Sequence, residues 1–239
     1  DQVDQLEAQL SGGVNRSSGV TVDHLVGLYN QGRFEDALKL GVVLSEQFPD
    51  NPEIPNIVGA IYSGLGKYEK AISNYNRAIE LKPDYAEIHY NLGNAFSKLD
   101  NYEDAVVSYT KAITYKSRYT DAHYNLGTAL IKLEDYEAAA EQFRHAIDIE
   151  PRFVEAYDNL GSALNNLGQY DEAIDNHEKA IELKPDYIIG YFNLGNVLSE
   201  IGEYIAATQN YKKAIIFNPN YVEAYDNLGA TEREIGFFE

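Results

Sequence analysis

The stretch Asn91–Ile113, "NLGNAFSKLDNYEDAVVSYTKAI", decides the fold of this chain because it returns with only some of its letters changed. A later copy, Asn159–Tyr187, reads "NLGSALNNLGQYDEAIDNHEKAIELKPDY". The glycine of the motif recurs every 34 residues, at Gly59, Gly93, Gly127, Gly161, Gly195 and Gly229. A fixed period of roughly 20–50 residues is typical of chains that stack one structural unit many times, so we expect a solenoid.

Each period predicts two helices. Apolar residues recur at helical spacing from Ala86 to Leu99 and again from about Tyr102 to Tyr115. Asp100-Asn101 supplies the turn between the two helices, and Pro83-Asp84 begins the repeat. The pattern therefore predicts an all-α fold of antiparallel helix pairs.

Small residues recur with the same step as the glycines. Two alanine positions repeat, one at Ala37, Ala71, Ala105, Ala139, Ala173 and Ala207, the other at Ala78, Ala112, Ala146, Ala180 and Ala214. Two helices approach closely only where their side chains are small, and large neighbours then fill the gaps. Because one helix pair cannot bury its apolar face alone, neighbouring pairs must stack.

The repeated motif resembles that of the tetratricopeptide repeat family over nearly the whole chain from about Val20 onward. The resemblance implies a right-handed superhelical solenoid in which the first helix of each repeat lines the concave surface. The first repeat departs from the pattern, since Leu25 stands in the glycine position and Gly41 in an aromatic position. Ser117 replaces a proline and His177 replaces an aromatic residue.

Because the repeat motif begins at about Val20, we expect an N-terminal segment and linker over residues 1–19 and a repeat array over residues 20–239. The array contains six repeats of about 34 residues and the first helix of a seventh, truncated at the C-terminus. Residues 1–10 have the pattern of a short amphipathic helix. The seventh repeat stops where its second helix should begin, so we expect the natural protein to continue past Glu239.

Composition excludes several classes of function. Acidic residues number 38 against 19 basic ones, and the net charge of −19 repels nucleic acid and anionic membranes. The chain has no cysteine and no apolar run long enough for membrane insertion. We therefore expect a cytoplasmic protein whose partner is another protein or a peptide.

No catalytic, phosphate-binding or metal-ligand motif is present, so we expect no enzyme activity in this chain, no cofactor and no metal. His89 and His123 occupy one repeat position on the packed side, where Tyr157, Tyr191 and Tyr225 also stand. We interpret both histidines as core residues.

A polar stripe runs along the first helix of each repeat, opposite the apolar one. By the resemblance, these stripes form one peptide-binding groove. Its predicted residues are Tyr90, Asn91, Asn94, Lys98, Tyr124, Asn125, Thr128, Lys132, Asp158, Asn159, Ser162, Phe192, Asn193, Asn196, Asp226 and Asn227. Five of them, Asn91, Asn125, Asn159, Asn193 and Asn227, form a ladder similar to that in the repeat superhelix of O-linked N-acetylglucosamine transferases.

An asparagine amide both donates and accepts, so a row of them can bind an extended peptide backbone. The predicted aromatic residues of the stripe supply apolar pockets beside the ladder. Carboxylates are frequent there and only Lys98 and Lys132 are basic, which favours a ligand carrying Lys or Arg. The same excess of carboxylates disfavours the C-terminal carboxylate of a heat-shock chaperone, which some family members clamp with lysine and arginine.

Two functions remain open from the sequence. One is a protein-interaction scaffold whose groove binds an extended peptide or a partner segment. The alternative is the substrate-recruiting region of a larger enzyme, a glycosyltransferase or sulfotransferase, whose catalytic domain lies beyond Glu239. Self-association through open solenoid ends is a third possibility.

Overall fold

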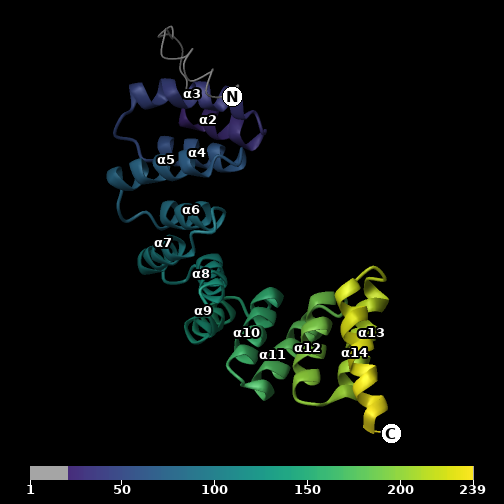
Figure 1. Cartoon of the computed structure of the whole chain (residues 1–239). Helices are drawn as coiled ribbons and strands as arrows, with labels where there is room; N and C mark the ends of the chain where they lie inside the picture. Colours follow the sequence, from purple (N-terminus) through teal and green to yellow (C-terminus); the bar gives the residue numbers. More distant parts are fainter. Residues whose placement is uncertain (1–20, 239) are drawn as a thin grey trace. The chain divides into compact units, whose positions relative to one another are not determined.

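The computed structural model describes residues 21–238, with side chains to residue 236, and the helix and linker expected within residues 1–19 lie outside this range. Between residues 21 and 238 the chain forms α-helices and no strand (Figure 1). They are α2 (Val22–Asn30), α3 (Phe34–Gln47), α4 (Glu53–Gly64), α5 (Tyr68–Leu81), α6 (Ala86–Ser97), α7 (Tyr102–Tyr115), α8 (Thr120–Lys132), α9 (Tyr136–Ile149), α10 (Val154–Asn166), α11 (Tyr170–Leu183), α12 (Ile188–Glu200), α13 (Tyr204–Phe217) and α14 (Val222–Phe238). The all-α solenoid of paired helices is confirmed.

The chain divides into two compact units, Asp1–Ser117 and Arg118–Glu239. The first unit holds α2 to α7 and the second holds α8 to α14. The boundary falls at Ser117, the residue that stands in the proline position of the repeat. We call the two parts unit 1 and unit 2 below.

The recurring glycines make room for buried rings. A Cβ atom on Gly127 in α8 would lie 2.8 Å from Cε1 of Phe143 in α9, much closer than van der Waals contact. Gly93, Gly161 and Gly195 meet Tyr109, His177 and Tyr211 in the same way. The glycine column is therefore required for the two helices of a repeat to pack.

The first repeat departs from this arrangement. Leu25 in α2 fills the glycine position and is fully buried, while Gly41 in α3 takes the place of the ring. A Cβ atom on Gly41 would lie 2.6 Å from Cγ2 of Val58, so this glycine also allows a close approach. Large and small residues have changed columns, and the nearest neighbour of Gly41 is Val58 of α4 rather than Leu25 of α2.

The turn inside each repeat needs a residue in the left-handed region. Four of these positions are glycines, at Gly32, Gly66, Gly168 and Gly202. Asp100 and Glu134 adopt the same backbone with φ of 55° and 60°, which costs a residue with a Cβ about 1 kcal/mol. The Tyr102 hydroxyl donates a hydrogen bond to Asp100 Oδ1 at 2.6 Å and steadies the first of these two turns.

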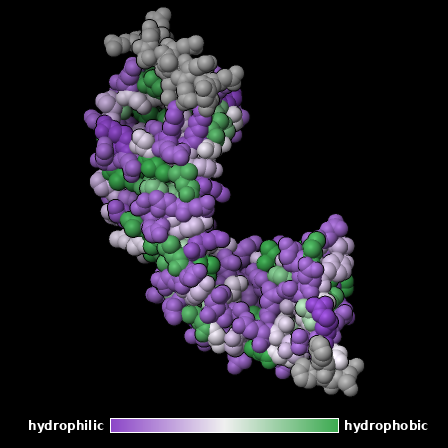
Figure 2. All heavy atoms as spheres, viewed as in Figure 1, coloured by the Kyte–Doolittle hydropathy of each residue, from purple (hydrophilic) through white to green (hydrophobic). Residues whose placement is uncertain are grey.

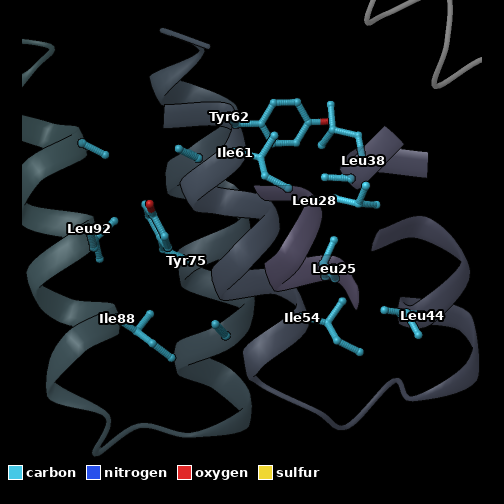
Figure 3. Packing of buried hydrophobic residues seen from close by; sticks show 14 residues of the cluster. Leu25, Leu28, Leu38, Leu44, Ile54, Ile61, Tyr62, Tyr75, Ile88 and Leu92 are labelled. Atoms are coloured by element: carbon cyan, nitrogen blue, oxygen red, sulfur yellow. The ribbon is translucent and has the colours of Figure 1, made fainter. Parts of the chain in front are cut away.

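The core of unit 1 is one row of aliphatic and aromatic side chains shared between successive helices (Figure 3). Leu25, Ile54, Ile61 and Ile88 are fully buried in it, and Tyr75 is almost so. Burying one such side chain contributes roughly 1.5–3 kcal/mol, so the row stabilises each repeat through its neighbours. Hydrophilic residues cover most of the surface visible in Figure 2.

The first helices lie on the inner side of each unit. In unit 2 they are α8, α10, α12 and α14, and each contacts the next, whereas α9, α11 and α13 make no comparable contact with one another. The same holds in unit 1, where α4 contacts both α2 and α6. Helices that remain close from repeat to repeat line the inside of a curved stack. The predicted stripe residues all stand on these first helices or at their ends.

None of the helices described between residues 21 and 238 is long and apolar enough to cross a membrane.

Candidate functional site

The ladder asparagines join neighbouring first helices. Asn159 in α10 is half-buried, and its Nδ2 donates to the hydroxyl of Tyr124 in α8 at 3.1 Å. Asn91 in α6 makes the equivalent bond to Oδ1 of Asn56 in α4 at 3.2 Å. Each asparagine reaches back by 35 residues, which brings it to the preceding first helix. The Nδ2 group of each of these asparagines therefore joins neighbouring first helices of the solenoid.

Asn193 follows the same rule with a charged acceptor. Its Nδ2 lies 3.2 Å and 3.1 Å from the two carboxylate oxygens of Asp158. Asn227 in α14 breaks the rule because the residue it would reach, Phe192, has no acceptor. Its Nδ2 turns instead to Oδ1 of Asn196, at 2.8 Å. Asn125, the remaining ladder residue, is half-buried in α8.

The next residues of the stripe turn toward the second helix or back to their own helix. Tyr109 donates its hydroxyl hydrogen to Asn94 Oδ1 at 2.7 Å, and Tyr211 donates to Asn196 Oδ1 at 3.0 Å. Where the ring has no phenol, the stripe residue bonds to its own backbone, as in Thr128 to Tyr124 O and Ser162 to Asp158 O. All four predicted residues are half-buried. Asn94 and Asn196 join the two helices of their hairpins, whereas Thr128 and Ser162 bond within their own helix.

Asp158 is not the exposed groove carboxylate that the stripe pattern predicts, because its side chain is buried and the residue is 2% exposed. Besides Asn193, it accepts from Nδ1 of His177 at 2.8 Å and from the hydroxyl of Tyr187 at 3.3 Å. Burial, and then the charge of Asp158, raise the pKa of Tyr187 well above its usual range. Asp158 is thus the centre of an internal polar cluster.

The cluster replaces a pair of aromatic rings. At equivalent positions Tyr90 meets Tyr109 and Phe192 meets Tyr211, each with ring centroids 6.0 Å apart. In this one repeat both rings are exchanged together, for a carboxylate on α10 and an imidazole on α11. The buried carboxylate is tolerated because three donors surround it.

The aromatic residues of the stripe are half-buried rather than open pockets. Tyr124 packs against Phe153 with centroids 4.7 Å apart, and Phe192 packs against Tyr221 at 4.9 Å. Burial raises the pKa of Tyr124, and the hydrogen bond from Asn159 opposes the rise. Of the other predicted residues, Lys98, Lys132 and Asp226 are exposed.

His89 and His123 are both buried, which confirms their interpretation as core residues. Nε2 of His89 lies 2.8 Å from the carbonyl oxygen of Pro83, the bond that the hydroxyl of Tyr191 makes to Pro185 in another repeat. Nδ1 of His123 lies 2.9 Å from Oε1 of Gln142. Among the residues that the structure describes, no group of three His, Asp or Glu could hold a metal ion.

The tyrosine variant His89→Tyr should change the pH dependence of stability. Burial lowers the pKa of His89 below its usual 6.5, so only the unfolded chain gains a proton just below that pH. The fold therefore loses stability as pH falls through 6.5, and removing this histidine should reduce that loss. Urea unfolding at several pH values between about 7.5 and 5.5 measures the difference. The exposed control His24→Tyr should keep the wild-type profile; identical profiles for all three proteins would contradict the prediction.

A cavity of about 300 Å³ opens between α12, α13 and α14. Its lining is Asn196, Ser199, Glu200, Tyr211, Asn227, Ala230 and Thr231. Asn196 and Asn227 are predicted site residues, whereas the other five lining residues are not: Ser199, Glu200, Tyr211, Ala230 and Thr231. No signal in the repeat pattern marks these five as one site, because the cavity depends on how α14 packs beside α12.

Paired helices with polar residues between successive first helices define a helical-repeat protein. Family models described as TPR repeat match residues 59–100, 161–202 and 195–232. Models described as tetratricopeptide repeat match residues 86–119, 120–153 and 143–175, so the matches together extend without a break from residue 59 to residue 232. The chain belongs to the tetratricopeptide repeat family.

Solved structures show the same fold. YrrB, described as a TPR protein with an unusual peptide-binding site, is 25% identical, with a TM-score of 0.71 over 78% of this chain and 96% of its own. A crystal structure of MamA is 26% identical, with a TM-score of 0.66 over 70% of this chain and 97% of its own. The C-terminal part of a TPR repeat-containing protein from Cytophaga hutchinsonii is 18% identical over 91% of this chain and 87% of its own, with a TM-score of 0.75. A comparison with curated proteins gives no match.

Proposed function

We propose that this protein is a non-catalytic interaction scaffold that binds an extended peptide segment of a partner protein along its first helices. The single observation that carries the proposal is the asparagine repeated at one position of successive first helices. Asn159 and Asn193 each have the amide nitrogen held by the preceding helix. The side-chain carbonyl oxygen remains for a ligand, as does the second hydrogen of the Asn159 amide, and both are oriented before binding.

Such a ladder presents acceptors and donors and therefore suits the N–H and C=O groups of a peptide backbone. Charge supports a basic or neutral peptide over an acidic one, since α10 and α12 contain no lysine or arginine. Glu155 and Glu223 are exposed at the starts of α10 and α14. The peptide-binding site named for YrrB further supports a peptide ligand for this fold.

Random ten-residue peptides displayed on phage provide the test. We expect the protein to select peptides that bind saturably, and Asn159→Ala to weaken them about threefold to tenfold, the value of one hydrogen bond. Asn176→Ala is the matched control, because Asn176 lies in the second helix α11 and donates to the carbonyl oxygen of Glu172. Fluorescence anisotropy measures affinity and circular dichroism measures the thermal unfolding of each variant.

The control should bind the selected peptides like the wild type. Equal affinity of Asn159→Ala and Asn176→Ala would remove the ladder from the proposal. Failure to select any peptide would remove the peptide ligand itself.

A further inference from the structure

One position in the first turn of the first helices from α4 to α14 is acidic everywhere except in α12. The residues at this position are all exposed, and they are Glu53, Glu87, Asp121, Glu155, Ile189 and Glu223. An acidic residue is ordinary there, because it faces the partial positive charge of a helix N-terminus. Ile189 forgoes that benefit, and its side chain is 50% exposed to water.

Ile189 adds to an apolar surface on α12. Phe192 lies three residues further along the helix, on the same face. Its ring packs against Tyr221 with centroids 4.9 Å apart, and both rings are half-buried. Single exposed apolar side chains are common on protein surfaces, but an exposed isoleucine beside this ring pair makes a small apolar patch. We call Ile189, Phe192 and Tyr221 the α12 patch.

The α12 patch borders the asparagine ladder. Ile189 precedes Asn193 by four residues, which places the two side chains one helical turn apart on the same face. Glu155 in α10 and Glu223 in α14 stand in the same relation to the ladder asparagines of their own helices. Because α12 contacts both α10 and α14, a second row runs beside the ladder, in the order carboxylate, isoleucine, carboxylate.

The two flanking carboxylates are available to a ligand. Among the residues that the structure describes, neither Glu155 nor Glu223 forms an ion pair. Lys184, which precedes α12, has its Nζ over the ring of Tyr187, 5.6 Å from the centroid. Burial, and then the charge of Glu223, raise the pKa of Tyr221, so this phenol is neutral. An apolar patch between two carboxylates favours a ligand with an apolar group between two positive ones.

The distance between neighbouring first helices sets the spacing of those ligand groups. Packed helices lie roughly 8–10 Å apart. A peptide in the polyproline II conformation advances about 3.1 Å per residue and has three residues per turn, so its side chains return to the same face after about 9 Å. Every third side chain of such a peptide therefore meets the next first helix. Its backbone groups make no internal hydrogen bonds and remain free for the ladder.

We propose that unit 2 selects an extended peptide that places one apolar side chain on the α12 patch. A lysine or arginine three residues before it and another three residues after it face Glu155 and Glu223. The inference rests on the proposed function and specifies its ligand. Ile189 decides the centre of this motif, because an acidic residue there would favour a third basic side chain instead.

Three fluorescein-labelled peptides test the motif. The first, GSKSSLSSKSG, has leucine at the centre; GSKSLSSSKSG has the same composition with the leucine moved by one residue; GSKSSKSSKSG has lysine at the centre. Fluorescence anisotropy with the full chain should show the first peptide binding about fivefold to tenfold more tightly than the second, as expected for partial burial of one leucine. Equal binding of these two peptides, or no binding of the first, would overturn the proposal.

The variant Ile189→Glu should change the preference, because it completes the acidic row. The affinity for the leucine-centred peptide relative to the lysine-centred one should fall by at least about tenfold, since an apolar contact is lost and a carboxylate is gained. Ile205→Glu is the matched control, because Ile205 is 69% exposed on the second helix α13 and should leave that ratio within about twofold of wild type. The same change for both variants would show general attraction to an acidic protein and overturn the proposal.

The motif and the peptide scaffold fail separately. If peptides selected from the phage library depend on Asn159 but bind Ile189→Glu and wild type equally, the motif fails and the scaffold stands. If the leucine-centred peptide binds in the expected register but is insensitive to Asn159→Ala, the ladder fails and the α12 patch stands. If neither the selected nor the designed peptides bind, both proposals fail.

Discussion

The variant Asp158→Leu will lose about 3–5 kcal/mol of unfolding free energy, the cost of removing one partner from a buried charged cluster. His177, Tyr187 and Asn193 all donate to this carboxylate, and each would be left facing an apolar side chain. Because a whole domain is stable by only about 5–15 kcal/mol, unit 2 should unfold at clearly lower urea concentration. Circular dichroism during urea unfolding measures the change.

A triple exchange should restore most of that loss. Asp158→Phe, Ser162→Asn and His177→Tyr together copy the arrangement of Phe192, Asn196 and Tyr211 from the next repeat. Replacing both partners of a buried polar interaction by packed apolar groups is often neutral or stabilising. In this variant the Asn193 amide should turn to the new asparagine, as Asn227 turns to Asn196. A triple variant no more stable than Asp158→Leu would show that the cluster is not equivalent to the ring pair.

The variant Gly127→Leu will lose about 3 kcal/mol, because a side chain at this position collides with a ring that cannot move away. Three ring atoms of Phe143 lie within 2.8–3.0 Å of the added Cβ, and Phe143 is fully buried. The helices α8 and α9 would have to separate. Urea unfolding gives the loss, and amide hydrogen exchange should show it first in these two helices.

Gly27→Ala is the matched control, since Gly27 also lies within a helix but a Cβ there meets nothing within 4 Å. It should stabilise the chain by about 0.5–1 kcal/mol, because alanine favours a helix over glycine. A Gly127→Leu variant as stable as Gly27→Ala would contradict the prediction.

Much of the fold follows from the sequence because contacts in a repeat array are short in range. The predicted helix Tyr102–Tyr115 has the bounds of α7, and α6 ends at Ser97, two residues before the predicted end at Leu99. The paired columns of glycine and aromatic residues indicated where two helices touch. The division into two units at Ser117 was not predicted, although Ser117 stood out as the missing proline.

The candidate site was less accessible to sequence reasoning. The repeat pattern reveals the asparagines, but it does not predict whether Nδ2 or Oδ1 of each side chain faces the neighbouring helix. That choice depends on the acceptor 35 residues earlier, a phenol for Asn159 and a carboxylate for Asn193. The cavity beside Glu200 involves α12, α13 and α14 at once, and no pairwise pattern describes it.

The helix pairs, their 34-residue period and the position of close packing could all be read from the residues alone, because they depend on side-chain size and helical spacing within one repeat and its neighbour. The burial of Asp158 could not be read in this way, because it depends on contacts made when the repeats pack together. A carboxylate on a polar stripe looks solvated until three donors from other parts of the chain are brought to it. Burial of a charge depends on the partners it meets, and the fold alone brings those partners together.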